Sequence, residues 1–308
     1  MGKIFNIGHR ILAACCLVIC VLLGGCSIPS SFEDDGKLRI VATTGMLADM
    51  AKNVGGEHVQ VVALMGPGVD PHLYKPTAGD IARITEADLI LFGGLHLEGR
   101  MTEVFDQLSD KSLDSSRALR RGRILLADDA PDPHFWHDPV LWAEIPVMLA
   151  ASLSKLDPLN QETYEQNAKN YRAALLRLAD ESREHLSKVP EQSRVLVTAH
   201  DAFQYFGEQF GFEVLGIQGT NTVSEAGANS IRSLADLIVN RKIKAIFVES
   251  SVPPATIQAL FEAVRSRGWQ IQIGGELFSD AMGEEGTHEG TYVGMIQHNV
   301  RTIAEALK

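Results

Sequence analysis

The sequence predicts an α/β protein of two lobes, each a mostly parallel sheet flanked by helices, joined by one long rigid helix. Two observations predict the sheets: short β-branched runs alternate with amphipathic segments over residues 38–92, and the same alternation returns over residues 195–273. Such alternation is typical of βαβ units, which build parallel sheets. A third observation predicts the joining helix, because residues 161–189 contain neither glycine nor proline.

The elements of both lobes follow from these runs, each bounded by turn-forming residues. In the first lobe, residues 37–156, we expect strands at 38–43, 59–64 and 89–92 and helices at 46–54 and 78–86. In the second lobe, residues 191–308, we expect strands at 195–198, 214–217, 245–248 and 270–273 and helices at 201–210, 230–240 and 254–267. Strands separated by single helices pair in parallel.

The connection between the lobes, residues 157–190, is predicted as one helix. Asp157 is a favourable cap, Pro158 suits the first turn, and apolar residues such as Tyr164 and Tyr171 recur at helical spacing. A helix of about 30 residues is roughly 45 Å long. Because such a connector resists bending, we expect small tilts of the lobes rather than wide closure.

The first 25 residues read as a secretory signal peptide. Lys3 and Arg10 precede an apolar run, residues 11–23, and two glycines follow it. The run is about a dozen residues long, whereas a membrane-spanning helix needs roughly 20. Removal of residues 1–25 is therefore favoured over a permanent transmembrane anchor.

Leu-Gly-Gly-Cys, ending at Cys26, resembles the bacterial lipobox, which predicts cleavage before Cys26 and a lipid on its sulfur. Residues 26–36 then form the lipidated cysteine and a polar tether. All four cysteines lie at or before Cys26, so the folded body has no disulfide and no thiolate site. A metal ion bound there would need nitrogen and oxygen ligands.

The composition is that of a folded, acidic protein. Of 308 residues, 45% are apolar and 22% are charged, which suffices for one large body or two lobes with separate cores. The formal charge is -11, and the basic residues form no cluster that would follow a phosphate backbone. Nucleic acid is therefore not an expected partner.

Potential metal ligands lie where predicted strands end. The tripeptide Asp-Pro-His occurs twice, ending at His72 and at His134. Its proline stiffens the backbone, and its aspartate can orient the imidazole or accept from nearby backbone amides. His200 follows a buried strand, and Asp280 lies in a glycine-rich segment after the last one. Open α/β sheets bind ligands at such carboxyl ends. By chemistry alone, His137 is a further candidate.

The sequence resembles the TroA, ZnuA and PsaA family, the metal-binding lipoproteins of bacterial ATP-driven importers for zinc and manganese, and most closely its TroA-type members. The similarity covers essentially the whole mature chain. The segments that carry it, in the order of the family, are GMLADMAKNVGG, MGPGVDPHLY, DLILFGGLHLEGRM, DPHFW, VLVTAHDAFQYFG, GFEVLGIQG, AIFVESSVP and GGELFSDAMG.

The resemblance implies that the metal is held by His72, His134, His200 and Asp280. The family usually has an apolar residue at the position of His137, so the resemblance implies that His137 is not a ligand. We expect it to lie beside the ligands or on the surface. The remaining candidates are expected to pack or to lie on the surface, namely His96, His288 and His298. Glu249 could contact a ligand or serve only in capping or packing, and it stays outside the ligand set.

Three imidazoles and one carboxylate suit Zn²⁺, whereas Mn²⁺ prefers more oxygen. Manganese-specialised members carry glutamate at the position of His200, but zinc-specialised members often carry a histidine-rich tract that is missing here. We therefore expect Zn²⁺ or Mn²⁺ as the transported ligand, with zinc slightly favoured.

The implied function is high-affinity capture of this ion outside the cytoplasmic membrane and its delivery to the permease subunits of an ABC importer. We expect a monomer attached to a bacterial membrane, at the periplasm or the cell surface, through Cys26. Four protein ligands leave no open position for an activated water, so we expect no enzymatic activity. The alternatives are a zinc-dependent hydrolase and a surface adhesin.

Overall fold

The computed structural model describes residues 32–127, 129–224 and 226–308. The predicted signal peptide, the lipidated Cys26 and the tether up to residue 31 lie outside the described residues. The described chain from Phe32 to Lys308 is one unit. The lobe boundaries proposed from the sequence stay predictions.

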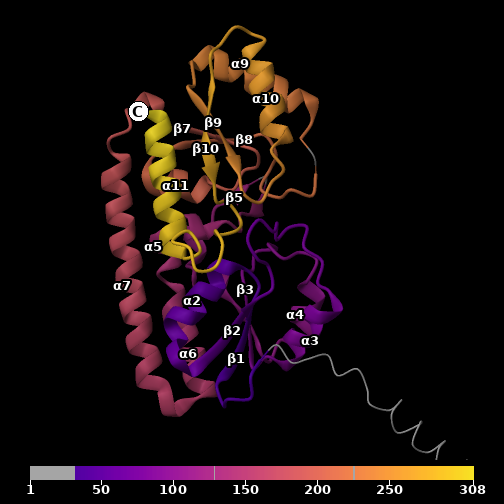
Figure 1. Cartoon of the computed structure of the whole chain (residues 1–308), viewed down its shortest axis with the longest axis vertical. Coiled ribbons are helices and arrows are strands. Elements are labelled where there is room, and N and C mark those ends of the chain that lie inside the picture. Colours follow the sequence, from indigo (N-terminus) through magenta and orange to yellow (C-terminus); the bar gives the residue numbers. More distant parts are fainter. Residues whose placement is uncertain (1–31, 128, 225) are drawn as a thin grey trace, which may run out of the picture. The chain divides into compact units, whose positions relative to one another are not determined.

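The first half of the chain forms a four-stranded parallel sheet in the order β2-β1-β3-β4 (Figure 1). Its strands are β1 (Leu38–Ala42), β2 (Val59–Ala63), β3 (Leu89–Phe92) and β4 (Ser112–Asp114). Ile40, Val41 and Ala42 are all fully buried. A strand buried on both faces needs such a continuous apolar run, as parallel sheets flanked by helices require. Strand β4, which the sequence pattern does not predict, completes the sheet.

Helices α2 (Gly45–Gly55), α3 (Ala78–Glu86) and α4 (Thr102–Gln107) belong to this half. The side chain of Thr44 caps α2 by accepting from the backbone N–H of Leu47. Thr77 and Asp80 form a reciprocal capping box at the start of α3. These caps satisfy backbone donors that the first helical turn leaves free, so they fix where each helix begins.

The second half contains two parallel strand pairs, β7 with β8 and β9 with β10, and β7 also packs against β9. The strands are β7 (Val195–Thr198), β8 (Glu213–Gly216), β9 (Ala245–Glu249) and β10 (Gln272–Leu277). The helices are α8 (Gln204–Phe210), α9 (Ala228–Arg241), α10 (Ala255–Arg265) and α11 (Tyr292–Leu307). Among the described residues, the one antiparallel pair of strands is β5 (Leu126–Ala127) with β6 (Ala130–Pro131), in the first half of the chain.

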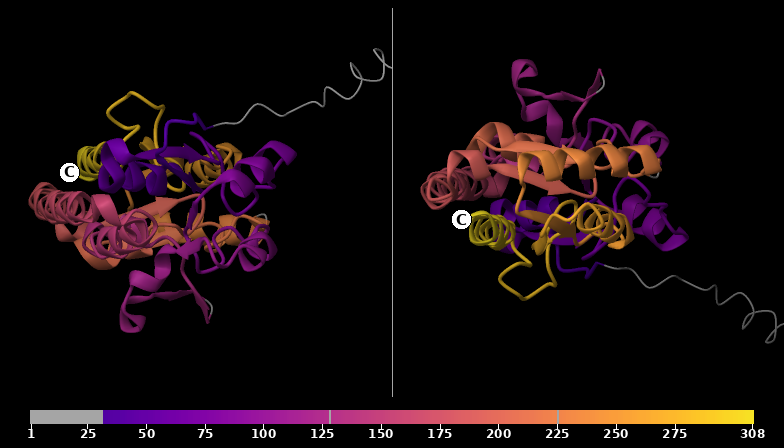
Figure 2. Two further views of the ribbon diagram at one scale, coloured as in Figure 1. Left: turned by 90° about the horizontal axis from the view of Figure 1, so that it is seen from below. Right: turned by 90° about the horizontal axis from the view of Figure 1, so that it is seen from above.

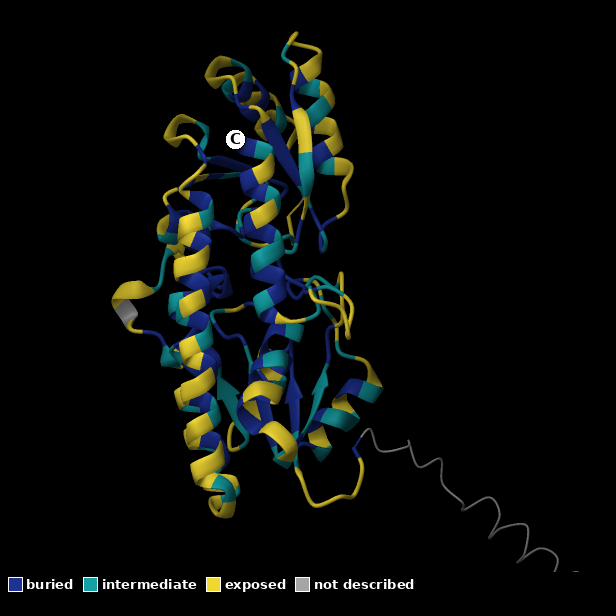
Figure 3. Cartoon of the chain, turned by 60° about the vertical axis from the view of Figure 1, so that its left-hand side comes forward, coloured by how far each residue is buried: buried dark blue, intermediate teal, exposed yellow. Residues whose placement is uncertain are grey.

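The long connecting helix forms as α7 (Gln161–Leu186), which is 26 residues long. It follows directly on a 3-10 turn at Pro158–Asn160. At 1.5 Å per residue it is about 39 Å long. It packs against α2, α5 (Pro139–Trp142) and α6 (Ile145–Leu156) from the first half and against α11 from the second. Figure 2 shows α7 and α11 side by side at one edge of the molecule. In Figure 3 one face of α7 is buried and the other exposed, as for an amphipathic helix.

The largest buried cluster is continuous from one half to the other. It contains Ile40 of β1 and Met50 of α2, Tyr171 of α7, and Phe206 and Tyr292 of the second half. Two further clusters lie at the outer faces of the two sheet regions. The shared cluster means that the two halves meet through packed side chains as well as through α7.

The stretch Pro139–Leu156, which contains α5 and α6, is long and apolar enough to cross a membrane by length and composition. However, 50% of it is buried inside the protein, and both helices pack against α7. Its apolar composition is accounted for by the core.

Candidate metal centre

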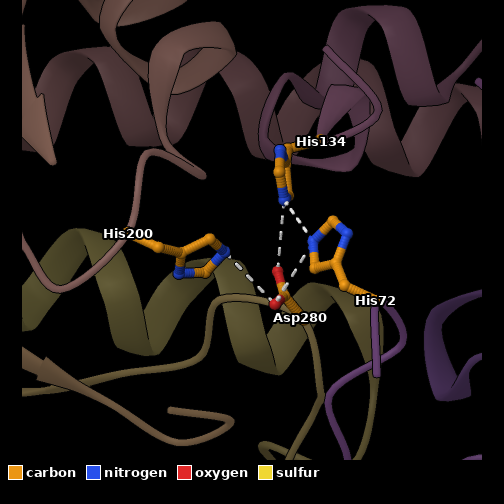
Figure 4. A group of neighbouring side chains, drawn as sticks. All are labelled: His72, His134, His200 and Asp280. Atoms are coloured by element: carbon orange, nitrogen blue, oxygen red, sulfur yellow. Dashed lines mark hydrogen bonds and ion pairs between the residues drawn. The ribbon is translucent and has the colours of Figure 1, made fainter. Parts of the chain in front are cut away.

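Four side chains converge between the ends of the strands of the two halves (Figure 4). They are His72 in the loop after β2, His134 just before the 3-10 turn Phe135–His137, His200 after β7 and Asp280 after β10. Each contributes one potential ligand atom, and these atoms all lie within 4.8 Å of one another. His72 is 5% exposed and Asp280 2%, whereas the other two are fully buried. The structure therefore brings together all four residues that the sequence predicts as ligands.

The spacing of these atoms matches what one small ion requires. Nε2 of His72 lies 3.2 Å from Nε2 of His134. Oδ2 of Asp280 lies 3.3 Å from Nε2 of His200 and 3.9 Å from Nε2 of His72, and Oδ1 lies 3.5 Å from Nε2 of His134. Four atoms bound tetrahedrally at about 2.0–2.2 Å from zinc would be roughly 3.3–3.6 Å apart. The three contacts of 3.2 to 3.5 Å are already close to this spacing, whereas the pairs that lie 3.9 to 4.8 Å apart would draw closer around an ion.

Two of the imidazoles are held from behind by carboxylates. Oδ1 of Asp132 accepts from the backbone N–H of His134 at 3.0 Å and lies 2.7 Å from its Nδ1. Oε1 of Glu249 accepts from the backbone N–H of His200 at 2.9 Å, and Oε2 lies 2.6 Å from its Nδ1. The contact of Asp132 with Nδ1 orients the ring of His134 so that Nε2 faces the cluster. Glu249 makes its hydrogen bond to the backbone of His200, and Nδ1 of that ring has no hydrogen-bond partner among the described residues.

The aspartate of the first Asp-Pro-His tripeptide has a different role. Oδ1 of Asp70 accepts from the backbone N–H of His72 at 2.8 Å. Its Oδ2 accepts from the hydroxyl of Thr222, which belongs to the second half of the chain. Asp70 therefore braces the loop of His72 against the opposite half, whereas Asp132 orients an imidazole ring.

The loop that carries Asp280 is fixed by residues that the sequence alone does not single out. Nε1 of Trp136 donates to the backbone carbonyl of Ser279 at 2.8 Å. Tyr292 donates its hydroxyl proton to the carbonyl of Trp136 at 2.7 Å. Ser251 donates to Oδ2 of Asp280 at 3.4 Å. Ser279, the partner of Trp136, is 143 positions away in the sequence. The sequence therefore gives no sign of this contact, and only the position of Trp136 within DPHFW draws attention to it.

Burial and charge act in opposite directions inside the cluster. Burial lowers the pKa of His72 to about 3, so this imidazole is neutral near pH 7. Burial also disfavours the charged form of His200, but the carboxylates of Glu249 and Asp280 outweigh it and raise its pKa well above the usual value. Burial raises the pKa of Asp280, but the facing imidazoles, His200 first, outweigh it and lower its pKa. Asp280 is a carboxylate, ready to bind a cation.

His137 lies beside the centre but is not part of the four-residue group. It is fully buried, so of the two places predicted for it the surface is wrong. Its ring stacks on Phe203 with the centroids 4.3 Å apart. Burial lowers the pKa of His137 to about 3, which keeps it neutral. Its burial follows from packing against α8, which the local sequence does not reveal.

The three other histidines considered as candidates, His96, His288 and His298, are not part of the cluster, as expected. His96 and His288 are exposed, and His288 pairs with Gln297 through a contact of 2.9 Å. Nε2 of His298 lies 3.0 Å from the carbonyl of Glu276 on β10.

Comparison with known proteins gives consistent matches over almost the whole chain. Residues 40–306 match the family described as the periplasmic component A of the zinc-uptake complex. The chain is 44% identical over 302 residues to the manganese-binding lipoprotein MntA of Bacillus subtilis strain 168, covering 96% of this chain and 99% of that protein. It is 46% identical over 301 residues to the zinc-binding protein TroA of Treponema pallidum strain Nichols, covering 96% and 98%.

The fold has the same relatives. The solved structure of the periplasmic zinc-binding protein TroA from Treponema pallidum superposes with a TM-score of 0.86 at 47% identity, over 88% of this chain and 99% of that one. A protein named for manganese and a protein named for zinc are thus similar to this chain to nearly the same degree.

Proposed function

Since this chain belongs to the family of the periplasmic component A of zinc-uptake complexes, we propose that it captures a divalent transition metal outside the cytoplasmic membrane. We propose further that it delivers the ion to the permease subunits of an ABC-type importer. The observation that carries this function is the buried convergence of three imidazoles and one carboxylate within 4.8 Å.

The proposed ligands are His72, His134, His200 and Asp280. Support comes from four contacts of 3.2 to 3.9 Å between their nitrogen and oxygen atoms, all within a group that spans at most 4.8 Å. The carboxylates of Asp132 and Glu249 beside two of the rings add to this support. The carboxyl groups of Asp280, Asp132 and Glu249 all lie in or beside the cluster. Three carboxylates there would more than balance a charge of +2. This balance favours a divalent cation in a site that water cannot screen.

The cargo is Zn²⁺ or Mn²⁺, and we favour zinc. A set of three nitrogens and one carboxylate fits four-coordinate zinc, whereas manganese selects more oxygen ligands. The carboxylate of Asp280 turns both oxygens towards imidazoles, Oδ1 to His134 and Oδ2 to His200. It can therefore supply a fifth ligand atom, which keeps manganese as the second candidate.

Transport without catalysis fits the geometry of this site. A hydrolytic zinc centre keeps one position open to water, whereas here four side chains surround the candidate position and each is at most 5% exposed. The family consists of solute-binding proteins. Among the described residues, no observation favours the alternatives of a zinc-dependent hydrolase or a surface adhesin.

The protein works outside the cytoplasm and is held at a membrane. We propose that the anchor is a lipid on Cys26 and that the chain acts as a monomer. The lipobox-like sequence before Cys26 supports the anchor, as does the name of the similar lipoprotein MntA. Labelling of intact cells with a radioactive fatty acid tests it: the wild type should be labelled, and a label that persists in Cys26→Ala would disprove it.

Metal content tests the function directly. The protein purified from its native envelope should contain one zinc or manganese ion per chain, and zinc should displace manganese in competition. The double variant with His72→Ala and Asp280→Ala should be metal-free. His288→Ala, which removes an exposed histidine, should bind like the wild type. An ion retained by the double variant, or a native protein without either metal, would overturn the proposal.

A further inference from the structure

Two buried serine hydroxyls lie beside the carboxylate of Asp280. Oγ of Ser251 lies 2.8 Å from Oγ of Ser279 and donates to Oδ2 of Asp280 at 3.4 Å. Ser251 is 7% exposed, and Ser279 is fully buried. Water therefore has little access to replace either contact.

The register of two parallel strands brings these serines together. Strand β9 ends at Glu249 and β10 at Leu277, and these two residues are paired. Ser251 and Ser279 each follow two positions later. The backbone N–H of Ser250 donates to the carbonyl of Leu277 at 2.9 Å, which continues the pairing beyond the strand ends. The two hydroxyls therefore meet at the edge of the sheet that carries Asp280.

The segment that contains Ser279 is held on both sides by buried side chains. The backbone N–H of Phe278 donates to Oδ1 of Asn299 at 2.9 Å, and Nδ2 of Asn299 donates to the carbonyl of Phe278 at 2.8 Å. Nε1 of Trp136 donates to the carbonyl of Ser279 at 2.8 Å. Ser279 is thus a fixed point to which the hydroxyl of Ser251 is attached.

The direction of the hydroxyl contacts follows from the number of protons. A carboxylate only accepts hydrogen bonds, whereas a serine hydroxyl has one proton and two lone pairs. Ser251 therefore gives its proton to Asp280 and accepts the proton of Ser279. The chain runs from Ser279 through Ser251 to Asp280, and each hydrogen bond polarises the next.

This chain holds one oxygen of Asp280 between imidazoles. Oδ2 lies 3.3 Å from Nε2 of His200 and 3.9 Å from Nε2 of His72. Oδ1 lies 3.5 Å from Nε2 of His134 and has no hydrogen-bond partner among the described residues. Rotation of the carboxylate to bring both oxygens equally close to one ion would move Oδ2 and strain its bond to Ser251. The bond therefore favours binding through one oxygen.

We propose that Ser251, supported by Ser279, is a positioning residue that holds Asp280 for binding through one oxygen and thereby favours zinc over manganese. The inference rests on the proposed function, because the ion is the cargo defined there. Four-coordinate zinc needs one oxygen from this carboxylate, whereas manganese selects more oxygen ligands. Neither serine contacts the ion, and both act through Asp280.

Replacement of Ser251 by alanine removes the proton that reaches Oδ2 and leaves the carboxylate free to rotate. Loss of a group behind a metal ligand lowers affinity by about 10 to 100-fold. Because the bond from Ser251 is long, at 3.4 Å, we expect zinc affinity to fall by about tenfold, the lower limit. Manganese gains access to the second oxygen, so its affinity should fall less. The preference for zinc therefore decreases.

The neighbouring serines supply matched variants. The hydroxyl of Ser250 is buried and has no hydrogen-bond partner within the described part of the chain, so Ser250→Ala should bind both metals like the wild type. Ser279→Ala leaves Ser251 its proton and should lower zinc affinity less than Ser251→Ala does. The double variant with Ser251→Ala and Ser279→Ala should match Ser251→Ala alone, because Ser279 acts only through Ser251.

The test measures zinc and manganese affinities by chelator competition for the full chain and these four variants. Crystal structures of the zinc-loaded wild type and Ser251→Ala give the second readout. In the wild type, one oxygen of Asp280 should lie about 2.0–2.2 Å from zinc and the other beyond bonding distance. In Ser251→Ala, the two distances should become more nearly equal.

Each outcome decides the inference. A folded Ser251→Ala protein with the wild-type ratio of zinc to manganese affinity would overturn it, and so would an equal change of this ratio in Ser250→Ala. Losses that add in the double variant would overturn the chain from Ser279 to Ser251.

Thermal melting of the metal-free proteins shows whether Ser251→Ala folds. If it does not, the zinc-loaded wild type decides, because Asp280 bound equally through both oxygens would overturn the inference. A wild type that binds neither metal would instead refute the proposed function, which separates the two claims.

Discussion

Replacement of Trp136 by phenylalanine tests whether Asp280 is held in place from the first half of the chain. The indole is 2% exposed, and its Nε1 donates to the carbonyl of Ser279, the residue before Asp280. Trp136→Phe leaves that buried carbonyl without its partner, which costs about 1–3 kcal/mol. It also removes roughly 40 Å³ of side chain, which adds about 1 kcal/mol for the cavity.

The total of about 2–4 kcal/mol corresponds to a melting temperature lower by roughly 3–7 °C for a chain of this size. Because the Asp280 loop loses a tether, zinc affinity should also fall by about tenfold. Differential scanning calorimetry of the metal-free protein measures the first effect, and chelator competition measures the second.

Trp142→Phe is the control for this prediction. Trp142 is 1% exposed and stacks on Tyr292 with the ring centroids 5.2 Å apart. Its replacement removes the same volume without releasing Ser279, so it should lower the melting temperature and leave zinc affinity unchanged. The reasoning fails if Trp136→Phe binds zinc as tightly as the wild type, or if both variants lose affinity equally.

Three further predictions follow from the site. Burial lowers the pKa of His200, but the carboxylates of Glu249 and Asp280 outweigh burial and raise the pKa above its usual value. A proton on this ring competes with zinc, so zinc affinity should rise with pH; calorimetry in buffers of different ionisation enthalpy should show proton release on zinc binding, and no release at any pH would contradict this reasoning. His134→Ala should abolish zinc binding while His137→Phe keeps it, and the reverse order in equilibrium dialysis would move the ligand assignment to His137. Lys52→Ala removes an exposed contact of 2.7 Å to Glu285 and should cost less than about 1 kcal/mol in urea unfolding; a larger loss would give that pair a structural role.

Local sequence signals predict most of the regular structure. Strand β3 and helix α3 have the predicted bounds, Leu89–Phe92 and Ala78–Glu86. The strand is a buried apolar run, and the helix begins at a capping box formed by Thr77 and Asp80. Both signals lie within the element itself. They can be read without knowledge of the rest of the chain.

Elements whose ends depend on distant contacts are predicted less well. Strand β10 is Gln272–Leu277, although the sequence predicts its end at residue 273. Two glycines follow Ile273, and they read as a turn. In the structure they form an irregularity in the pairing with β9, and the strand then resumes at Glu276. The partner strand, not the local sequence, carries β10 through these glycines.

The candidate site also combines features that local sequence predicts with features that depend on distant contacts. The tripeptides at His72 and His134 and the strand before His200 are local patterns, and the family resemblance joins them to Asp280. The contacts that position them are not local. Glu249 is 49 positions from His200, so only the fold reveals that it accepts a hydrogen bond from the backbone N–H of that residue.

A zinc-edge anomalous diffraction map of the metal-loaded protein tests the central claim most directly. We expect one strong peak per chain, about 2.0–2.2 Å from Nε2 of His72, His134 and His200 and from a carboxylate oxygen of Asp280. A peak bound by His137 in place of any of these residues, or the absence of a peak within the cluster, would contradict the account.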